Sequence, residues 1–138
     1  MTSLKDIKVV VKGTHEPSGN ALALLHEIHH ALTQLLKSSQ ETIIDLQSIP
    51  LSPSDETQLF NSLGKGEIEV HLNVLGKSII QETGTSGVWL IKHFNEEEQP
   101  VGKYIEITQI PSILKSQFED IEQGLKKLAS QLTGSIQN

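Results

Sequence analysis

Hydrophobic and polar positions change their spacing along the chain, and each change marks an expected element. Ala21–Lys37 carries apolar side chains at helical spacing, which predicts an amphipathic helix with one apolar stripe. The stripe consists of Ala21, Leu24, Leu25, Ile28, Ala31, Leu32, Leu35 and Leu36. Short β-branched runs at Ile7–Val11 and Thr42–Leu46 predict one strand before this helix and one after it.

A second helix is expected after residue 52. Ser52 is a capping residue, Pro53 suits a first helical turn, and the acids that follow lie near the positive end of the helix dipole. The helix should run to Leu63 and stop at Gly64, because glycine accepts the left-handed conformation that often ends a helix.

The spacing then shortens to two residues, as in a strand with one buried face. Ile68, Val70, Leu72 and Val74 alternate with polar residues. Further strands are expected at Ser78–Thr83, Val88–Phe94 and Lys103–Gln109, separated by turn-forming segments. Strands joined by short turns predict an antiparallel meander.

A final helix is expected over residues 111–134, opened by Pro111. Its apolar side holds Ile113, Leu114, Phe118, Ile121, Leu125, Leu128 and Leu132. The predicted order is therefore β-α-β-α-β-β-β-β-α. This is an α+β fold with a mixed, largely antiparallel sheet and helices packed on one face. At 138 residues the chain suits a single domain, 1–138.

Composition narrows the classes of function. The net charge is −6 and the chain contains no arginine, so we expect no nucleic-acid partner. No apolar run is long enough for a membrane helix, and the first residues lack the apolar core of a signal peptide. There is no cysteine, which excludes thiolate metal ligands and thiol catalysis by this chain. We expect a cytoplasmic protein without a cofactor and without a membrane partner.

The letters H-E-I-H-H at His26–His30 match the zinc-protease signature H-E-x-x-H. His26 and His30 would share a metal and Glu27 would act as a base. The extended signature is missing, because Thr33 and Leu36 stand where glycine and histidine are needed. The two histidines also fall opposite the apolar stripe, as on a solvated face. The main interpretation is therefore a non-enzymatic protein. A zinc-dependent hydrolase is the alternative, and delivery of nickel or iron through the histidines is a third possibility.

The late strands predict a polar and aromatic sheet face. If Val88 and Leu90 face the helices, strand alternation turns Trp89 and His93 the other way. Tyr104 and Glu106 should join them, and Glu67, Glu69 and His71 are expected on the same side. Aromatic side chains anchor protein interfaces, so this face is a candidate protein-binding surface. The alternative is that Trp89 belongs to the core or is covered.

Several segments, in order, resemble a known family. They are L-L-H-E-I-H-H-A-L at Leu24–Leu32, I-D-L-Q-S-I-P-L-S-P-S-D at Ile44–Asp55 and L-G-K-G-E at Leu63–Glu67, followed by Glu82, G-V-W at Gly87–Trp89, His93, Asn95 and I-E-I-T-Q-I-P at Ile105–Pro111. Together they are similar to the C-terminal conserved region of HupH-type hydrogenase expression proteins, also called HoxQ or HyaF. The resemblance covers residues 20–114.

The resemblance implies an accessory role in the maturation of nickel–iron hydrogenase. Family members are thought to attend the iron–sulfur small subunit precursor before it joins the large subunit, which is chaperone-like work without catalysis. The family supplies no catalytic residues to carry over. Its members are usually about twice this length, with two related units, and this chain holds one. Whether the chain pairs with itself as a homodimer is left open.

Overall fold

A five-stranded antiparallel sheet is the centre of the computed structural model, which describes residues 19–73 and 76–134. Its strands are β1 (Thr42–Asp45), β2 (Lys65–Asn73), β3 (Lys77–Thr83), β4 (Val88–Phe94) and β5 (Pro100–Ile107), in the spatial order β1-β5-β4-β3-β2. The α+β class and the meander are confirmed. Every strand pair in the described residues is antiparallel, so no mixed sheet is seen there. The strand predicted at Ile7–Val11 lies outside the described residues.

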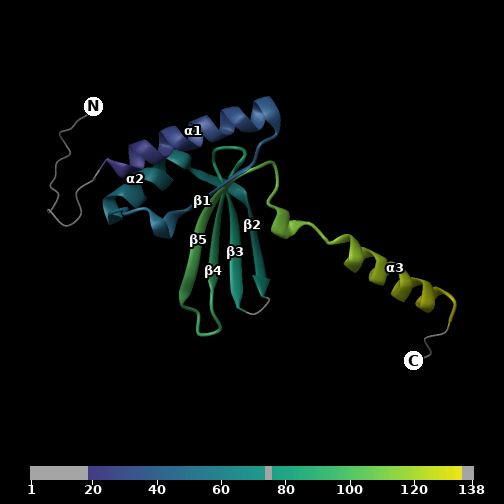
Figure 1. Ribbon diagram of the computed structural model, residues 1–138. Helices are drawn as coiled ribbons and strands as arrows, with labels where there is room; N and C mark the ends of the chain where they lie inside the picture. The colour runs from purple at the N-terminus through teal and green to yellow at the C-terminus, as the bar shows by residue number, and fades with distance from the viewer. Residues whose placement is uncertain (1–18, 74–75, 135–138) are drawn as a thin grey trace.

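Helices α1 (Asn20–Ser38) and α2 (Pro53–Leu63) lie together at one end of the sheet (Figure 1). The buried stripe of α1 contains Ala21, Leu24, Ile28 and Ala31. These residues and Leu59 and Leu63 of α2 form one cluster with Val88, Leu90, Ile105 and Ile107 of the sheet. We call this side of the sheet the inner face. The predicted packing of helices on one face is confirmed for α1 and α2.

Side chains of the opposite parity form a second, smaller cluster on the outer face. Its buried members are Ile80, Trp89 and Ile91, and Val70, Leu72, Tyr104 and Leu114 pack against them. Because neighbouring residues of a strand point to opposite faces, β4 contributes to both clusters. Val88 to Ile91 are therefore all buried.

Local signals explain both ends of α2. The Ser52 hydroxyl accepts a hydrogen bond from the Asp55 backbone N–H at 3.0 Å, and the Asp55 carboxylate accepts one from the Ser52 N–H at 3.0 Å. This reciprocal capping box satisfies two N–H groups that the helix leaves unpaired. Gly64 ends the helix at a φ of 79°, where its N–H bonds to the Phe60 carbonyl. The predicted start and stop are confirmed.

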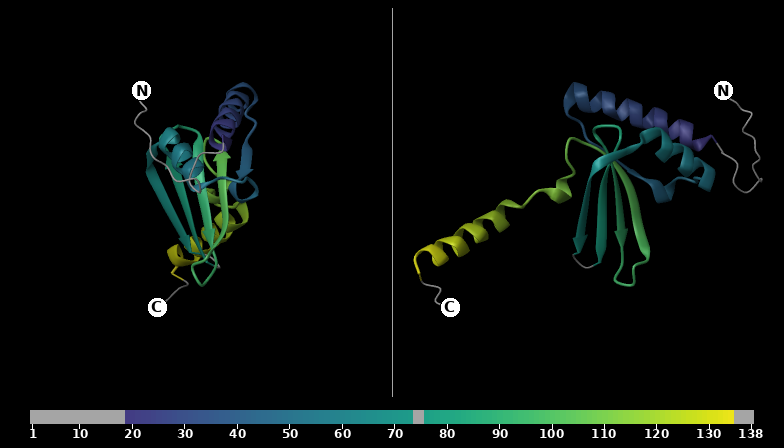
Figure 2. Two further views of the ribbon diagram at one scale, coloured as in Figure 1. Left: turned by 90° about the vertical axis from the view of Figure 1, so that its left-hand side faces the viewer. Right: turned by 180° about the vertical axis from the view of Figure 1, so that it is seen from behind.

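The last helix differs from the prediction. Residues Ser112–Leu114 form a short 3-10 turn, and α3 begins only at Phe118 and ends at Leu132. The backbone at Lys115 and Gln117 is extended, and α3 points away from the sheet (Figures 1 and 2). None of its residues is buried, so the expectation that this helix covers the sheet is wrong. None of the described helices combines the length and apolar character needed to cross a bilayer.

We expect Ser52→Ala to lower the free energy of unfolding by about 1 kcal/mol, because the first turn of α2 then loses its capping oxygen. Urea denaturation followed by circular dichroism measures this change. Ser52→Gly should cost only a few tenths of a kcal/mol, since glycine leaves the backbone N–H groups open to water. Equal losses for the two variants would contradict the capping explanation.

Candidate functional site

The outer face brings together four of the five residues predicted to bind a protein. The register pairs Trp89 with Glu106, and Ile91 with Tyr104. Directly paired residues of antiparallel strands share a face, so Trp89, Tyr104 and Glu106 lie on one side. His93 follows at the next position of the same parity on β4. The shared face of these four residues is confirmed, whereas their role in binding stays a prediction.

Trp89 lies on this face and is nevertheless part of the core. Its side chain is only 5% exposed, and its indole N–H donates to the Thr108 carbonyl at 3.2 Å. Leu114, from the turn after β5, packs against the same cluster. The alternative interpretation, that Trp89 is a core residue, is therefore confirmed. A binding partner would contact the residues around Trp89, because the indole itself is buried.

His93 and Tyr104 are partly buried and fix each other's orientation. Their rings meet edge to face, with centroids 5.9 Å apart and an interplanar angle of 61°. The Ser78 hydroxyl lies 2.7 Å from the His93 Nδ1 atom. Such a held pair presents aromatic area and a ring nitrogen at small entropic cost, which suits recognition of a protein surface.

Glu106 places on the outer face a carboxyl group whose ionised form is disfavoured. Partial burial raises the pKa of its carboxyl group above the ordinary value, and the nearby Glu41 carboxylate raises this pKa further. The Glu41 side chain itself accepts a hydrogen bond from the Thr108 hydroxyl at 2.8 Å. Among the described residues no lysine or histidine forms an ion pair with Glu106. A cationic group on a binding partner would stabilise the ionised form of Glu106.

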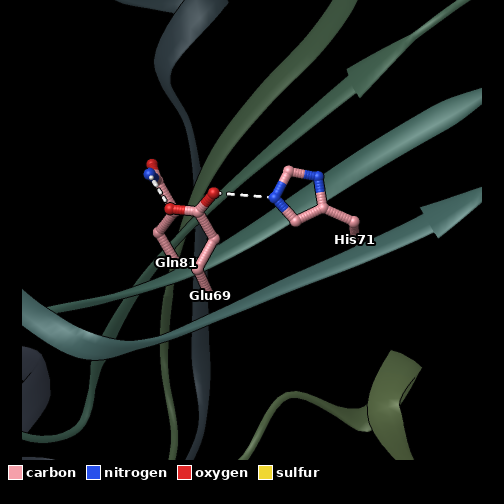
Figure 3. Close-up of polar contacts among 3 residues, drawn as sticks. All are labelled: Glu69, His71 and Gln81. Atoms are coloured by element: carbon pink, nitrogen blue, oxygen red, sulfur yellow. Dashed lines mark hydrogen bonds and ion pairs between the residues drawn. The ribbon is translucent and has the colours of Figure 1, made fainter.

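His71 does not share the outer face, so that part of the prediction is wrong. Val70 pairs with Ile80 and turns toward the outer cluster, which places His71 and Glu69 on the inner face. Figure 3 shows Glu69 between its two partners, with His71 Nε2 at 2.7 Å and the Gln81 side-chain amide at 3.0 Å. These hydrogen bonds lower the pKa of the Glu69 carboxyl group, with Gln81 the larger cause.

The histidines of the H-E-x-x-H match lie on the solvent side of α1. His26, Glu27 and His30 are exposed, opposite the buried Ala21 and Leu24, as the helix geometry predicted. Within residues 19–73 and 76–134, no three histidine, aspartate or glutamate side chains stand close enough together to hold a metal ion. In this part of the chain a catalytic zinc would have two ligands and no third.

Sequence reasoning missed three residues that shape the outer face: Ser78, Glu41 and Leu114. Ser78 stands opposite His93 in the register, and Glu41 precedes β1, which pairs with β5. The sequence pattern assigns Leu114 to the final helix, whereas the structure places it in the 3-10 turn after β5. Strand pairing brings Ser78 and Glu41 to the face, and a linear pattern of alternation carries no information about that pairing.

The sequence of the chain matches a known protein family over most of its length. The family described as "HupH hydrogenase expression protein, C-terminal conserved region" matches residues 19–134. The chain belongs to this family of hydrogenase expression and formation proteins.

Individual relatives agree with the family match. The chain is 30% identical over 111 residues to the hydrogenase expression/formation protein HupQ of Azotobacter chroococcum, covering 79% of this chain and 39% of the relative. It is 27% identical over 119 residues to HoxQ of Cupriavidus necator, covering 85% and 42%. The chain thus spans about two fifths of the length of these relatives.

A solved structure shares the fold. The hydrogenase expression protein HupH from Thiobacillus denitrificans superposes with a TM-score of 0.78 at 36% sequence identity, over 86% of this chain and 98% of that chain. The fold described above is therefore the fold of this family.

We expect Trp89→Ala to lower the free energy of unfolding by about 3–5 kcal/mol, because it opens a cavity in the outer cluster. Trp89→Phe keeps most of the volume and loses the hydrogen bond to Thr108, at a cost of about 1–2 kcal/mol. Chemical denaturation with circular dichroism measures both. A small loss for Trp89→Ala would show that the indole is not a core element.

Glu106→Gln should raise the free energy of unfolding at pH 7, because it removes a negative charge that the folded state disfavours. The gain should be about 0.5 kcal/mol or less, since solvent screens a partly exposed charge. The raised pKa means that the folded state holds the proton more tightly than the unfolded state, so ionisation of Glu106 costs stability above its folded pKa. The gain should vanish below about pH 4.3, the ordinary glutamate pKa, where the carboxyl group is protonated in both states. Denaturation curves at several pH values check this, and a gain that persisted at low pH would contradict the electrostatic cause.

Proposed function

We propose that this chain is a non-enzymatic, chaperone-like accessory factor in nickel–iron hydrogenase maturation. It binds a hydrogenase subunit, the iron–sulfur small subunit precursor, before the subunits assemble, and it works in the cytoplasm. Membership in the family of hydrogenase expression proteins supports a role in hydrogenase maturation. The named relatives are themselves expression and formation proteins.

The observation that carries the mode of action is the outer sheet face, which α1 and α2 leave uncovered. Helices α1 and α2 pack on the inner face, and the turn that ends in Leu114 is the described non-strand segment that packs against the outer cluster. The outer face combines an ordered aromatic pair, His93 and Tyr104, with the carboxylate of Glu106. Aromatic side chains anchor protein interfaces, and a carboxylate beside them can select a partner of opposite charge.

An exposed isoleucine extends this surface toward the sheet edge. Ile43 pairs with Glu106 in the register, so it shares the outer face, and 65% of its side chain is exposed. An apolar contact there, bordered by the Glu106 carboxylate, would favour a client segment that carries both an apolar and a basic side chain. Substrate turnover is not required of this surface, because it works by covering an immature subunit.

The test is co-purification of the chain with the hydrogenase small-subunit precursor and, separately, with the large subunit, with metal content measured on the same samples. We expect a metal-independent complex with the small-subunit precursor. Absence of a complex with either subunit would overturn the proposal. One tightly held zinc per chain together with no complex would favour the hydrolase alternative.

Ile43→Asp tests the surface itself. It should weaken the complex at least tenfold, because a charge replaces the apolar contact of the outer face. Leu22→Asp is the matched control, since Leu22 is also exposed but lies in the first turn of α1, where an acid suits the helix dipole. Binding constants from calorimetry should fall for Ile43→Asp alone. Equal binding by both folded variants would remove the outer face from the mechanism.

A further inference from the structure

Two adjacent hollows lie along α2 on the inner face of the sheet. The larger has a volume of about 510 Å³ and lies between α2 and strands β2 to β5. The smaller has a volume of about 450 Å³ and lies between α2, the 3-10 turn at Leu46–Ser48 and the start of β5. Both hollows are lined by Glu56 and Lys103, whose ion pair separates them. We call the two hollows together the α2 groove.

The ion pair that divides the α2 groove is a weak barrier. The Nζ atom of Lys103 and the Oε1 atom of Glu56 are 3.5 Å apart, and their side chains are 28% and 42% exposed. An ion pair of this length and exposure contributes little to stability, so the two side chains separate at small cost. A ligand that enters one hollow can therefore extend into the other.

The larger hollow contains a positive charge that the fold does not balance. Lys92 follows Leu90 at the same strand parity, so it lies on the inner face, directly opposite Lys103 in the register. Like charges at directly paired positions destabilise a sheet. Glu56 pairs with Lys103, whereas Lys92 forms no ion pair in the described part of the chain. A negative group placed between the two lysines would be attracted to both.

The smaller hollow is lined mainly by apolar side chains. Leu46, Ile49 and Leu51 come from the segment before α2, and Pro100 comes from the start of β5. Ile49 and Leu51 pack against the inner cluster but are only partly buried. The α2 groove thus joins an apolar end to a basic end, which suits an elongated ligand that carries an apolar group and a negative charge.

The neighbours of the basic end favour a carboxylate as the negative group. Gly64, at the carboxyl end of α2, lines the larger hollow, and a helix carries partial negative charge at this end. A singly charged carboxylate is repelled less by this helix end than a doubly charged phosphate. The chain also contains no arginine, the side chain suited to bidentate phosphate binding. The ligand chemistry is therefore that of an aspartate or glutamate side chain.

We propose that the α2 groove binds an extended peptide segment of a partner protein, with an apolar side chain in the smaller hollow and a carboxylate between Lys92 and Lys103. The incoming carboxylate displaces Glu56 from Lys103. The outer face presents the carboxylate of Glu106, so the two faces of the sheet select partner segments of opposite charge. The proposal does not depend on hydrogenase maturation, because it rests only on the lining of the groove.

The first experiment measures binding of labelled synthetic peptides to the full chain by fluorescence anisotropy. The peptides carry leucines at one end and glutamates at the other, in either order, joined by serine spacers of varied length. Matched peptides carry lysines in place of the glutamates. We expect at least one acidic peptide to bind with a dissociation constant below about 1 mM, and at least tenfold more tightly than its lysine counterpart. Failure of every acidic peptide to bind, or equal binding of both kinds, would overturn the proposal.

Lys92→Glu tests the basic end of the groove. It should weaken binding of the acidic peptide at least tenfold, because the charge that meets the carboxylate is reversed. The variant should stay at least as stable as the wild type in circular dichroism melts, since the new carboxylate would lie opposite Lys103. Lys127→Glu is the matched control, because it makes the same charge change on α3, outside the groove. Equal binding by the two folded variants would overturn the proposal.

Glu56→Gln tests the displacement of the ion pair. Removal of this carboxylate frees Lys103, so binding of the acidic peptide should become severalfold tighter. An ion pair that only supports the fold would leave binding unchanged or weaken it. Either of those results would therefore overturn the displacement of Glu56 by the peptide.

Discussion

Burial of β4 on both faces is the constraint on which the rest of this fold depends. Val88 and Leu90 complete the cluster beneath α1 and α2, while Trp89 and Ile91 hold the outer cluster. A strand buried on both sides normally has helices or a second sheet on each face. Among residues 19–73 and 76–134, helices pack only on the inner face. The outer face is closed at its centre by large side chains and by Leu114, and its margins remain open.

That asymmetry explains why the candidate surface lies around Trp89 and not on it. The indole is buried beside Glu106 in the outer cluster and donates a hydrogen bond to the Thr108 carbonyl, so it supports the surface from beneath. His93 and Tyr104 lie toward one end of the face and Glu106 toward the other. The Glu106 carboxylate is held at some cost to folding. Groups that are costly to the fold tend to gather at functional sites, where selection acts on binding as well as on stability.

Where the signal is local, the sequence predicts the structure closely. The capping box at Ser52 and the stop at Gly64 define α2 through hydrogen bonds only a few residues long. Alternation along β4 and β5 places Trp89, His93, Tyr104 and Glu106 together. For β2 the same alternation yields two sets of residues without showing which set faces the helices. Pairing of Val70 with Ile80 decides this, and it puts His71 on the inner face. The apolar side of α3 likewise looks the same in sequence whether it covers the sheet or points away from it.

The two edges of the sheet are poorly suited to backbone pairing with neighbouring molecules, whereas its open face presents side chains for contact. Strand β1 has four residues, and β2 carries Lys65, Glu67 and Glu69 along an edge interrupted by a register shift. Short, charged or irregular edges resist the backbone pairing that leads to edge-to-edge aggregation. A protein that leaves Ile43 and the apolar side of α3 in water needs this protection. The protein therefore associates with other molecules through side chains, which can distinguish one partner from another. Backbone pairing cannot make that distinction.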